Sequence, residues 1–170
     1  MGSVCRMKRV QMGPLAAMDV PETWVSGPPK DGVHWYGSPD GASSLFVDGG
    51  LIDISPAADP HDTLTHAANT IVSCIEEEDV VGDIELKLHQ RREEGPLAIL
   101  FATVDFTEGD AAWRTYQWHM LAWTGPDTLG VARFILEVPQ EDAGDPFVAS
   151  LCASLAAQAR SIAMTRRVDH

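Results

Sequence analysis

The sequence has few cysteines. Cys5, Cys74 and Cys152 are the three in 170 residues, at wide spacing and in odd number. This pattern excludes the disulfide framework that holds many small secreted domains together, and no CxxC pair marks a metal or redox site. We therefore predict reduced thiols. Cys74 and Cys152 fall within helical patterns, where a free cysteine is usually a small buried residue.

Basic residues are also scarce. The chain has 12 Lys and Arg against 25 Asp and Glu, a formal net charge of -13 at pH 7. A surface this negative repels phosphate backbones and anionic lipids, so we expect no nucleic-acid partner and no membrane partner. The charge has two interpretations: it keeps the protein soluble, or it attracts a basic protein partner.

Long hydrophobic runs are missing, and none reaches the roughly 18 residues that indicate a membrane-spanning helix. The N-terminal stretch also lacks the apolar core of a signal peptide, because Gln11, Gly13 and Pro14 interrupt it. Hydrophobic residues still make up 45% of the chain, enough for a buried core. We expect a cytoplasmic protein with a flexible segment at 1–17, one domain at 18–165 and a frayed tail at 166–170.

Catalytic motifs are absent as well. The sequence contains no HExxH, GxGxxG, GxxxxGK[ST] or GxSxG pattern, and its six histidines have no metal-ligand spacing. We therefore predict no metal site and no cofactor. An enzyme would need the distant residues Asp105, His119 and Arg133 to converge in one cleft.

Strand patterns are what the chain has in abundance, above all between Leu97 and Gln140. Three runs follow one another with turn signals between them: LAILFATVDF, AWRTYQWHMLAW and VARFILEV. The first is apolar at nearly every position, which is typical of a strand covered on both faces. The alternating run DIELKLHQ precedes them and adds a half-solvated strand. Together they predict an antiparallel meander.

Two helices flank this meander. Apolar positions between Leu64 and Ile75 recur at helical spacing, with Asp59 or Asp62 as the N-cap. Asp145 and Pro146 open the second helix, whose apolar stripe is Phe147, Leu151, Leu155 and Ile162. The order predicts an α+β fold, in which an antiparallel β-sheet of about six to seven strands packs with two helices as an α/β/α sandwich.

The N-terminal half is expected to add short strands. Val33–Tyr36 and Ser44–Val47 read as a hairpin around SPDG. Asp48-Gly49-Gly50 then reads as a turn that leads to a further strand at Leu51–Ile54. Pro21 limits the stretch MDVPETWV to an edge strand or a turn.

Aromatic residues make up 7% of the chain and gather on the strand around 113–123. Most are expected to be core or cross-strand pairs, but Trp and Tyr also dominate binding hot spots. Since this strand carries aromatics on both faces, one face is a candidate groove. The candidate partner- or ligand-binding residues are Arg114, Tyr116, Trp118, His119 and Trp123.

The arrangement resembles the Mog/PsbP-like family over about residues 18 to 165. The likeness lies in Pro21 followed by Trp24, the hairpin around GSPDG, the mid-chain helix, the meander and a final helix opened by DP. It implies an α/β/α sandwich with an antiparallel sheet and mostly non-enzymatic binding or accessory roles. It transfers no catalytic residue.

We therefore predict a small acidic cytoplasmic protein-binding or accessory domain without catalytic activity. Its partner is expected to be another protein, with a basic partner and a homodimer both left open. The alternative is a small apolar ligand-binding domain of helix-grip type, with a cavity lined by Trp118, Phe134 and Leu151. An enzyme is the least favoured of the three hypotheses.

Overall fold

The computed structural model describes residues 6–12, 16–54, 59–91, 95–125 and 127–162. The predicted tail at 166–170 lies outside these ranges. The elements follow one another as β1 (Met7–Met12), β2 (Ala16–Pro21), β3 (Val25–Ser26), β4 (His34–Gly37), β5 (Ser44–Asp53), α1 (Pro60–Ile75), β6 (Asp79–Val80), β7 (Glu85–His89), β8 (Leu97–Glu108), β9 (Ala111–Gly125), β10 (Thr128–Pro139), a 3-10 turn (Gln140–Asp142) and α2 (Pro146–Arg160).

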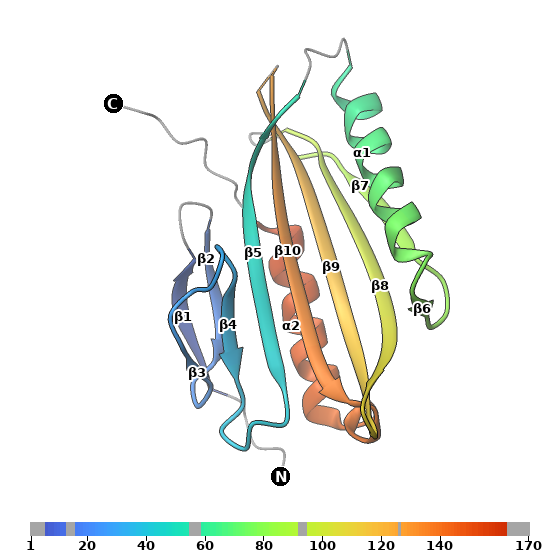
Figure 1. Cartoon of the computed structure of the whole chain (residues 1–170). Coiled ribbons are helices and arrows are strands. Elements are labelled where there is room, and N and C mark those ends of the chain that lie inside the picture. Colours follow the sequence, from blue (N-terminus) through green and yellow to red (C-terminus); the bar gives the residue numbers. More distant parts are fainter. Residues whose placement is uncertain (1–5, 13–15, 55–58, 92–94, 126, 163–170) are drawn as a thin grey trace.

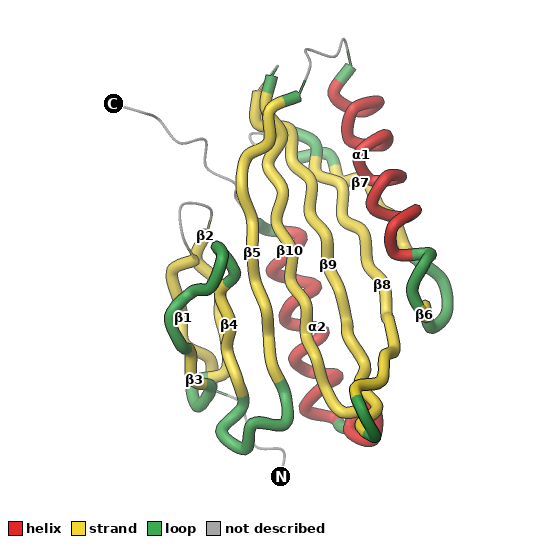
Figure 2. Tube along the Cα trace, viewed as in Figure 1, coloured by secondary structure: helices red, strands yellow, loops and turns green. Residues whose placement is uncertain are grey.

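One eight-stranded antiparallel sheet organises the described chain. Its strands lie in the order β3-β4-β5-β10-β9-β8-β6, and β7 also pairs with β8. The two helices lie on opposite sides of it, with α1 in front and α2 behind in the view of Figure 1; Figure 2 shows the same layers by element type. This confirms the predicted α+β fold. The main sheet has eight strands where six to seven were expected, and β1 and β2 form a separate two-stranded sheet.

The predicted turn at Asp48-Gly49-Gly50 is wrong. These residues lie inside β5, which pairs without interruption with β10 from Ser44 to Asp53. Gly49 and Gly50 face Ala132 and Val131 across the ladder. Glycine is depleted in strands but not excluded from them, and here the long partner strand determines the conformation that the local sequence leaves undecided.

The N-terminal segment contributes a strand where a flexible stretch was expected. Residues Met7–Met12 form β1, which pairs with β2 in an antiparallel hairpin. The side chains of Met18 and Val20 on β2 are 2% and 0% exposed and pack on the same side of the main sheet as α2. Gln158 on α2 fixes this contact, because its side chain accepts a hydrogen bond from Asp19 N at 2.8 Å and donates one to Asp19 O at 3.0 Å.

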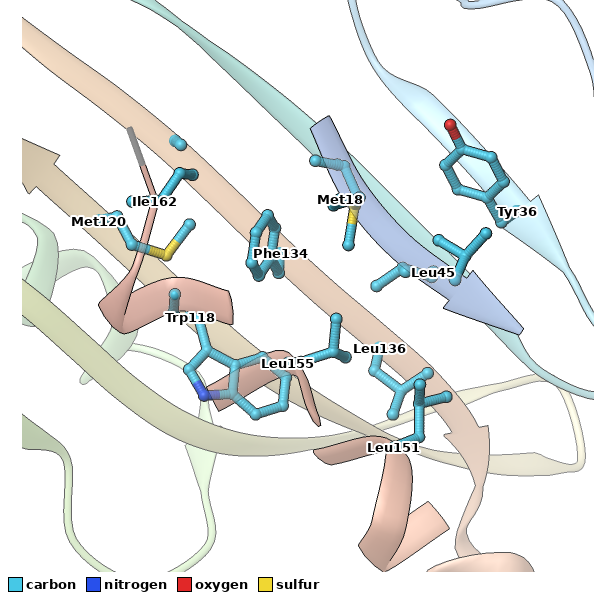
Figure 3. Packing of buried hydrophobic residues seen from close by; sticks show 14 of the residues in the cluster. Met18, Tyr36, Leu45, Trp118, Met120, Phe134, Leu136, Leu151, Leu155 and Ile162 are labelled. Carbon is cyan, nitrogen blue, oxygen red and sulfur yellow. The ribbon is translucent and has the colours of Figure 1, made fainter. Parts of the chain in front are cut away.

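The larger core lies between the sheet and α2. Strands β5, β9 and β10 meet the helix through alternate side chains, as expected for a strand with one face turned to a core. Figure 3 shows this packing for Leu45, Trp118, Met120, Phe134, Leu136, Leu151 and Leu155. Val148 belongs to the buried stripe of α2, whereas the predicted Phe147 is 40% exposed.

The place expected for a helix-grip cavity is filled by side chains. Trp118, Phe134 and Leu151 are 3%, 1% and 4% exposed and belong to one packed cluster. The cavity predicted for the alternative function, a ligand-binding domain of helix-grip type, is therefore not present between these three residues.

The smaller core lies between α1 and the other side of the sheet. Leu64 and Ala68 of α1 pack against Ala98, Leu121 and Leu129. Farther along the helix, Ile75 closes a second cluster over β8, with Leu100, Ala102 and Val104. Strand β8 is thus covered by apolar contacts on both sides, as its continuous apolar run predicts.

Asp59 is expected to be the N-cap that stabilises α1. Its carboxylate accepts a hydrogen bond from His61 N at 2.9 Å. An Asp59→Ala variant should lose about 1 kcal/mol of unfolding free energy in a urea titration, because one helix-end N–H loses its partner. Asp62→Ala is the control, since Asp62 also lies in the first turn but is not the cap residue. A larger loss for Asp62→Ala would contradict this assignment.

Candidate functional site

The five residues predicted to form a binding site point to opposite sides of the sheet. All belong to β9, where successive side chains alternate between the two faces. Arg114, Tyr116 and Trp118 are on the α2 side, whereas His119 and Trp123 are on the α1 side with the buried Leu121. The set therefore does not come together in one surface.

The three residues on the α2 side make internal contacts. Arg114 donates two hydrogen bonds to the Asp105 carboxylate, at 2.7 and 2.9 Å, and this pairing lowers the pKa of Asp105. The Tyr116 hydroxyl donates to Ala143 O at 3.5 Å. The Trp118 indole is 3% exposed and tilts against the ring of Phe101 at a centroid distance of 5.0 Å. Arg114 and Trp118 thus hold strands and core together.

The residues on which an enzyme would depend are separated as well. Asp105 pairs with Arg114 on the α2 side, whereas His119 and Arg133 face each other in register on the α1 side. The hypothesis that Asp105, His119 and Arg133 converge in one cleft is therefore wrong, because the sheet lies between them.

Part of the α1 side of the sheet is covered by no helix of the described chain. α1 packs mainly on β8 and β9 and reaches β10 only at its start, near Leu129, whereas Figure 1 shows no helix in front of the rest of β10 or of β5 and β4. We call this surface the open face. Its residues, all half-buried, are Trp35 on β4, Phe46 and Asp48 on β5, and Arg133, Ile135 and Glu137 on β10.

Aromatic rings continue the open face at its two borders. At the β4 border Trp35 lies close against the backbone, since a Cβ added at Gly27 would stand 2.6 Å from its ring. At the other border Phe106 and Trp113 stack at a centroid distance of 6.4 Å on the β8–β9 hairpin, which extends past the end of α1 in Figure 1. Both rings are half-buried.

Charge on the open face is mainly negative. Arg133 donates to both oxygens of the Asp48 carboxylate, at 3.1 and 2.6 Å, so these two charges balance. Burial raises the pKa of Glu137, and the nearby Glu108 carboxylate raises it further. In the described parts of β5, β8, β9 and β10, Arg133 is the one Lys or Arg directed to this side, and no ion pair there includes Glu108 or Glu137.

A groove of about 400 Å³ separates the open face from α1. It has a polar floor on β9 and β10 and a mixed wall on α1. The residues that line it are Thr70, Ile71, Cys74, Ile75, Glu78, Gln117, His119, Arg133 and Ile135.

A chain of hydrogen bonds runs along the floor of this groove. Thr115 Oγ1 donates to Val104 O at 3.0 Å and accepts from Gln117 Nε2 at 3.1 Å. Gln117 Oε1 in turn lies 3.1 Å from His119 Nε2, which must therefore carry the proton and donate. Burial lowers the pKa of His119 to about 4, with Arg133 adding to the decrease and Asp48 opposing it. His119 is thus a neutral donor near pH 7.

The groove holds one thiol. Cys74 is exposed on α1, which corrects its predicted buried position. Among the described residues, no group of three or more His, Cys, Asp or Glu side chains is placed to hold a metal ion. Within the same residues, no helix combines the length and apolar character needed to cross a membrane.

Sequence reasoning missed Trp35, Phe46 and Phe106 as surface residues. The signal was present in part, because Trp35 and Phe46 alternate with Tyr36 and Leu45 on paired strands. Alternation shows that two neighbouring residues point to opposite faces of the sheet, but it does not show which face a helix covers. The covered face depends on where α1 packs across the strands.

Comparisons with known proteins reveal a likeness of fold. No family model matches the sequence, and no curated protein matches it. The crystal structure of LpqN, involved in cell envelope biogenesis of Mycobacterium tuberculosis, is similar at a TM-score of 0.55 and 12% identity, covering 95% of this chain and 91% of LpqN. The Saccharomyces cerevisiae Ran-binding protein Mog1p has a TM-score of 0.45 and 14% identity, over 90% and 94% of the two chains. At this level of identity the similarity to LpqN shows the fold alone.

Proposed function

We propose that the protein is a non-catalytic binding domain whose open face receives a protein partner. The observation that supports this best is a sheet surface with no helix over it that presents Trp35, Phe46 and Ile135 on one side. Aromatic anchors surrounded by polar residues are typical of protein interfaces. The groove beside α1 continues this surface and offers polar partners at its floor.

The partner that we propose has a basic surface. The net charge of -13 attracts a positively charged protein from a distance and speeds its association. On contact, Glu108 and Glu137 offer carboxylates, and the rings of Trp35 and Trp113 offer cation–π contacts. A second copy of this chain would bring the same negative charge to the interface, so a homodimer is the less favoured occupant.

The cytoplasm is the compartment that we propose for this binding. Cys74 and Cys152 are free thiols in the described chain, a state that fits a reducing compartment. Nucleic acid and anionic membranes are not proposed as partners, because the same net charge repels their phosphates.

Site-specific photo-crosslinking in the host cell tests the docking surface. A photoreactive phenylalanine analogue is placed at Phe46 on the open face and, as a control, at the exposed Ala149 on α2. We expect a distinct adduct with a basic protein from position 46 and not from position 149. Equal capture from both positions, or capture of a second copy of this chain alone, would contradict the proposal.

Binding of the captured protein, once purified, tests the charge argument. Glu137→Lys is expected to weaken the affinity by about tenfold or more, and added salt should weaken the wild-type complex. Glu22→Lys is the matched control, because it makes the same charge change at an exposed position after β2, outside the open face. Equal losses for the two variants would indicate general attraction and no docking at this face.

A further inference from the structure

A second hollow lies on the opposite side of the sheet, between α2 and the paired strands β7 and β8. Its volume is about 360 Å³, at the small end of the range of about 300–1,000 Å³ that is typical of small-molecule sites. We call it the α2 cleft. Its residues are Glu85, Lys87, His89, Ile99, Phe101, Trp118, Cys152, Ala153, Ala156 and Arg160.

The floor of the α2 cleft is apolar and firmly placed. Ile99 is 8% exposed, and the tilted ring pair of Phe101 and Trp118 joins β8 to β9 below it. The wall on α2 consists mainly of the small side chains of Cys152, Ala153 and Ala156. Cys152 and Ala156 are one helical turn apart, so they lie on the same side of the helix. Burial raises the pKa of Cys152 to about 12, so this wall carries a neutral thiol.

Small residues on the helix explain why the hollow exists. The large residues of the α2 stripe, Leu151 and Leu155, point into the main core and not into the cleft. The side of α2 that faces β7 therefore brings little side-chain volume to the space beside the ring pair. Phe134, an expected wall of a helix-grip cavity, is likewise absent from this hollow.

The rim of the cleft is basic, in contrast to the acidic chain as a whole. Glu85, Lys87 and His89 pair in register with Phe101, Ile99 and Leu97, so their side chains share the α2 side of the sheet. Arg160 stands on the other rim, in the last turn of α2. Neither Lys87 nor Arg160 has an ion-pair partner among the described residues, and Glu85 is the single carboxylate that lines the cleft.

We propose that the α2 cleft binds a small amphipathic carboxylate, such as an aromatic acid or a medium-chain fatty acid. The apolar part would lie on Phe101 and Trp118, and the carboxylate would be held at the rim by Lys87 and Arg160. Two cations on opposite rims of an apolar floor match an anion with an apolar body, and the size of the cleft limits that body to one or two rings or a short chain. This site is independent of the open face, which lies across the sheet.

Calorimetric titration of the full-length protein tests this proposal with pairs of probes that differ only in the head group. The acids are naphthalene-2-carboxylate and decanoate, and the neutral counterparts are naphthalene-2-methanol and decanol. We expect saturable binding of at least one acid, with its alcohol weaker by about tenfold or more. No saturable binding of either acid, or equal binding of acid and alcohol, would overturn the proposal.

Variants locate the bound acid. Lys87→Gln and Arg160→Gln change exposed rim residues, and each should weaken the acid by about fivefold or more while leaving the alcohol unchanged. Lys30→Gln removes the same charge from an exposed loop and should change the affinity of neither probe.

Ala156→Phe should fill the cleft and abolish binding of both probes. If this variant does not fold, amide shifts of wild-type protein with decanoate decide between the α2 cleft and another surface, and shifts confined to the open face would refute the site.

Discussion

A Phe134→Ala variant is expected to lose about 3–5 kcal/mol of unfolding free energy. Phe134 is 1% exposed and stands in the centre of the core between α2 and the sheet, where Figure 3 shows it among the other buried side chains. Truncation removes the transfer free energy of the ring and leaves a cavity that the long strands cannot close. Since domains of this kind are stable by about 5–15 kcal/mol, the midpoint in a guanidinium titration should fall markedly.

Ile135→Ala is the matched control for this experiment. Ile135 is the next residue on β10, but it is half-buried on the open face. Its truncation should cost about 1–2 kcal/mol, because part of the side chain is already in water. Equal losses for the two variants would mean that a further segment covers β10, and the open face would then not be available to a partner.

The second large effect is a loss of stability on acidification through His119. Burial lowers the pKa of this imidazole from 6.5 to about 4 in the folded protein. Between these two values the unfolded chain binds a proton that the folded protein does not bind. The contribution is therefore fully present above about pH 6.5 and is lost as the pH falls toward about 4, by roughly 2–3 kcal/mol after allowance for partial exposure.

His119→Gln isolates this contribution from those of other groups. The amide retains a donor for Gln117 but does not titrate, so the variant should lose less stability than the wild type over the same pH range. The neighbouring charged residues Asp48, Arg133 and Glu78 are present in both proteins, so the comparison changes the imidazole alone. Denaturant titrations of both proteins near neutral pH and near pH 4 measure this difference in unfolding free energy. An imidazole NMR titration with a midpoint near its ordinary value would contradict the buried, neutral state.

The predictable parts of the fold are those that local patterns determine. Asp145 caps α2 as predicted, and Asp59, one of the two predicted candidates, caps α1. The apolar run from Leu97 is covered on both sides. The pairing of Gly49 and Gly50 within β5 was not predictable, because it depends on Val131 and Ala132, more than eighty residues along the chain.

The site was harder to predict than the fold for a related reason. Alternation on β9 separated Arg114 and Trp118 from His119, but it did not show which set α2 would bury. Arg114 is paired with Asp105 and Trp118 is packed, whereas the open face draws Trp35 and Phe46 from strands near the beginning of the chain. The position of α1 determines which part of the sheet stays uncovered. The sequence pattern of a single strand does not reveal that position.

The bond between Asp19 and Gln158 has a consequence for the order in which this protein folds. It joins residues 139 positions apart, and the core beside it combines Met18 and Val20 with Leu155 of the last helix. Contacts of such high sequence separation form slowly. During synthesis the apolar side chains of β2 therefore lack their partners on α2 until that helix has been made, a stage at which exposed apolar surface favours aggregation.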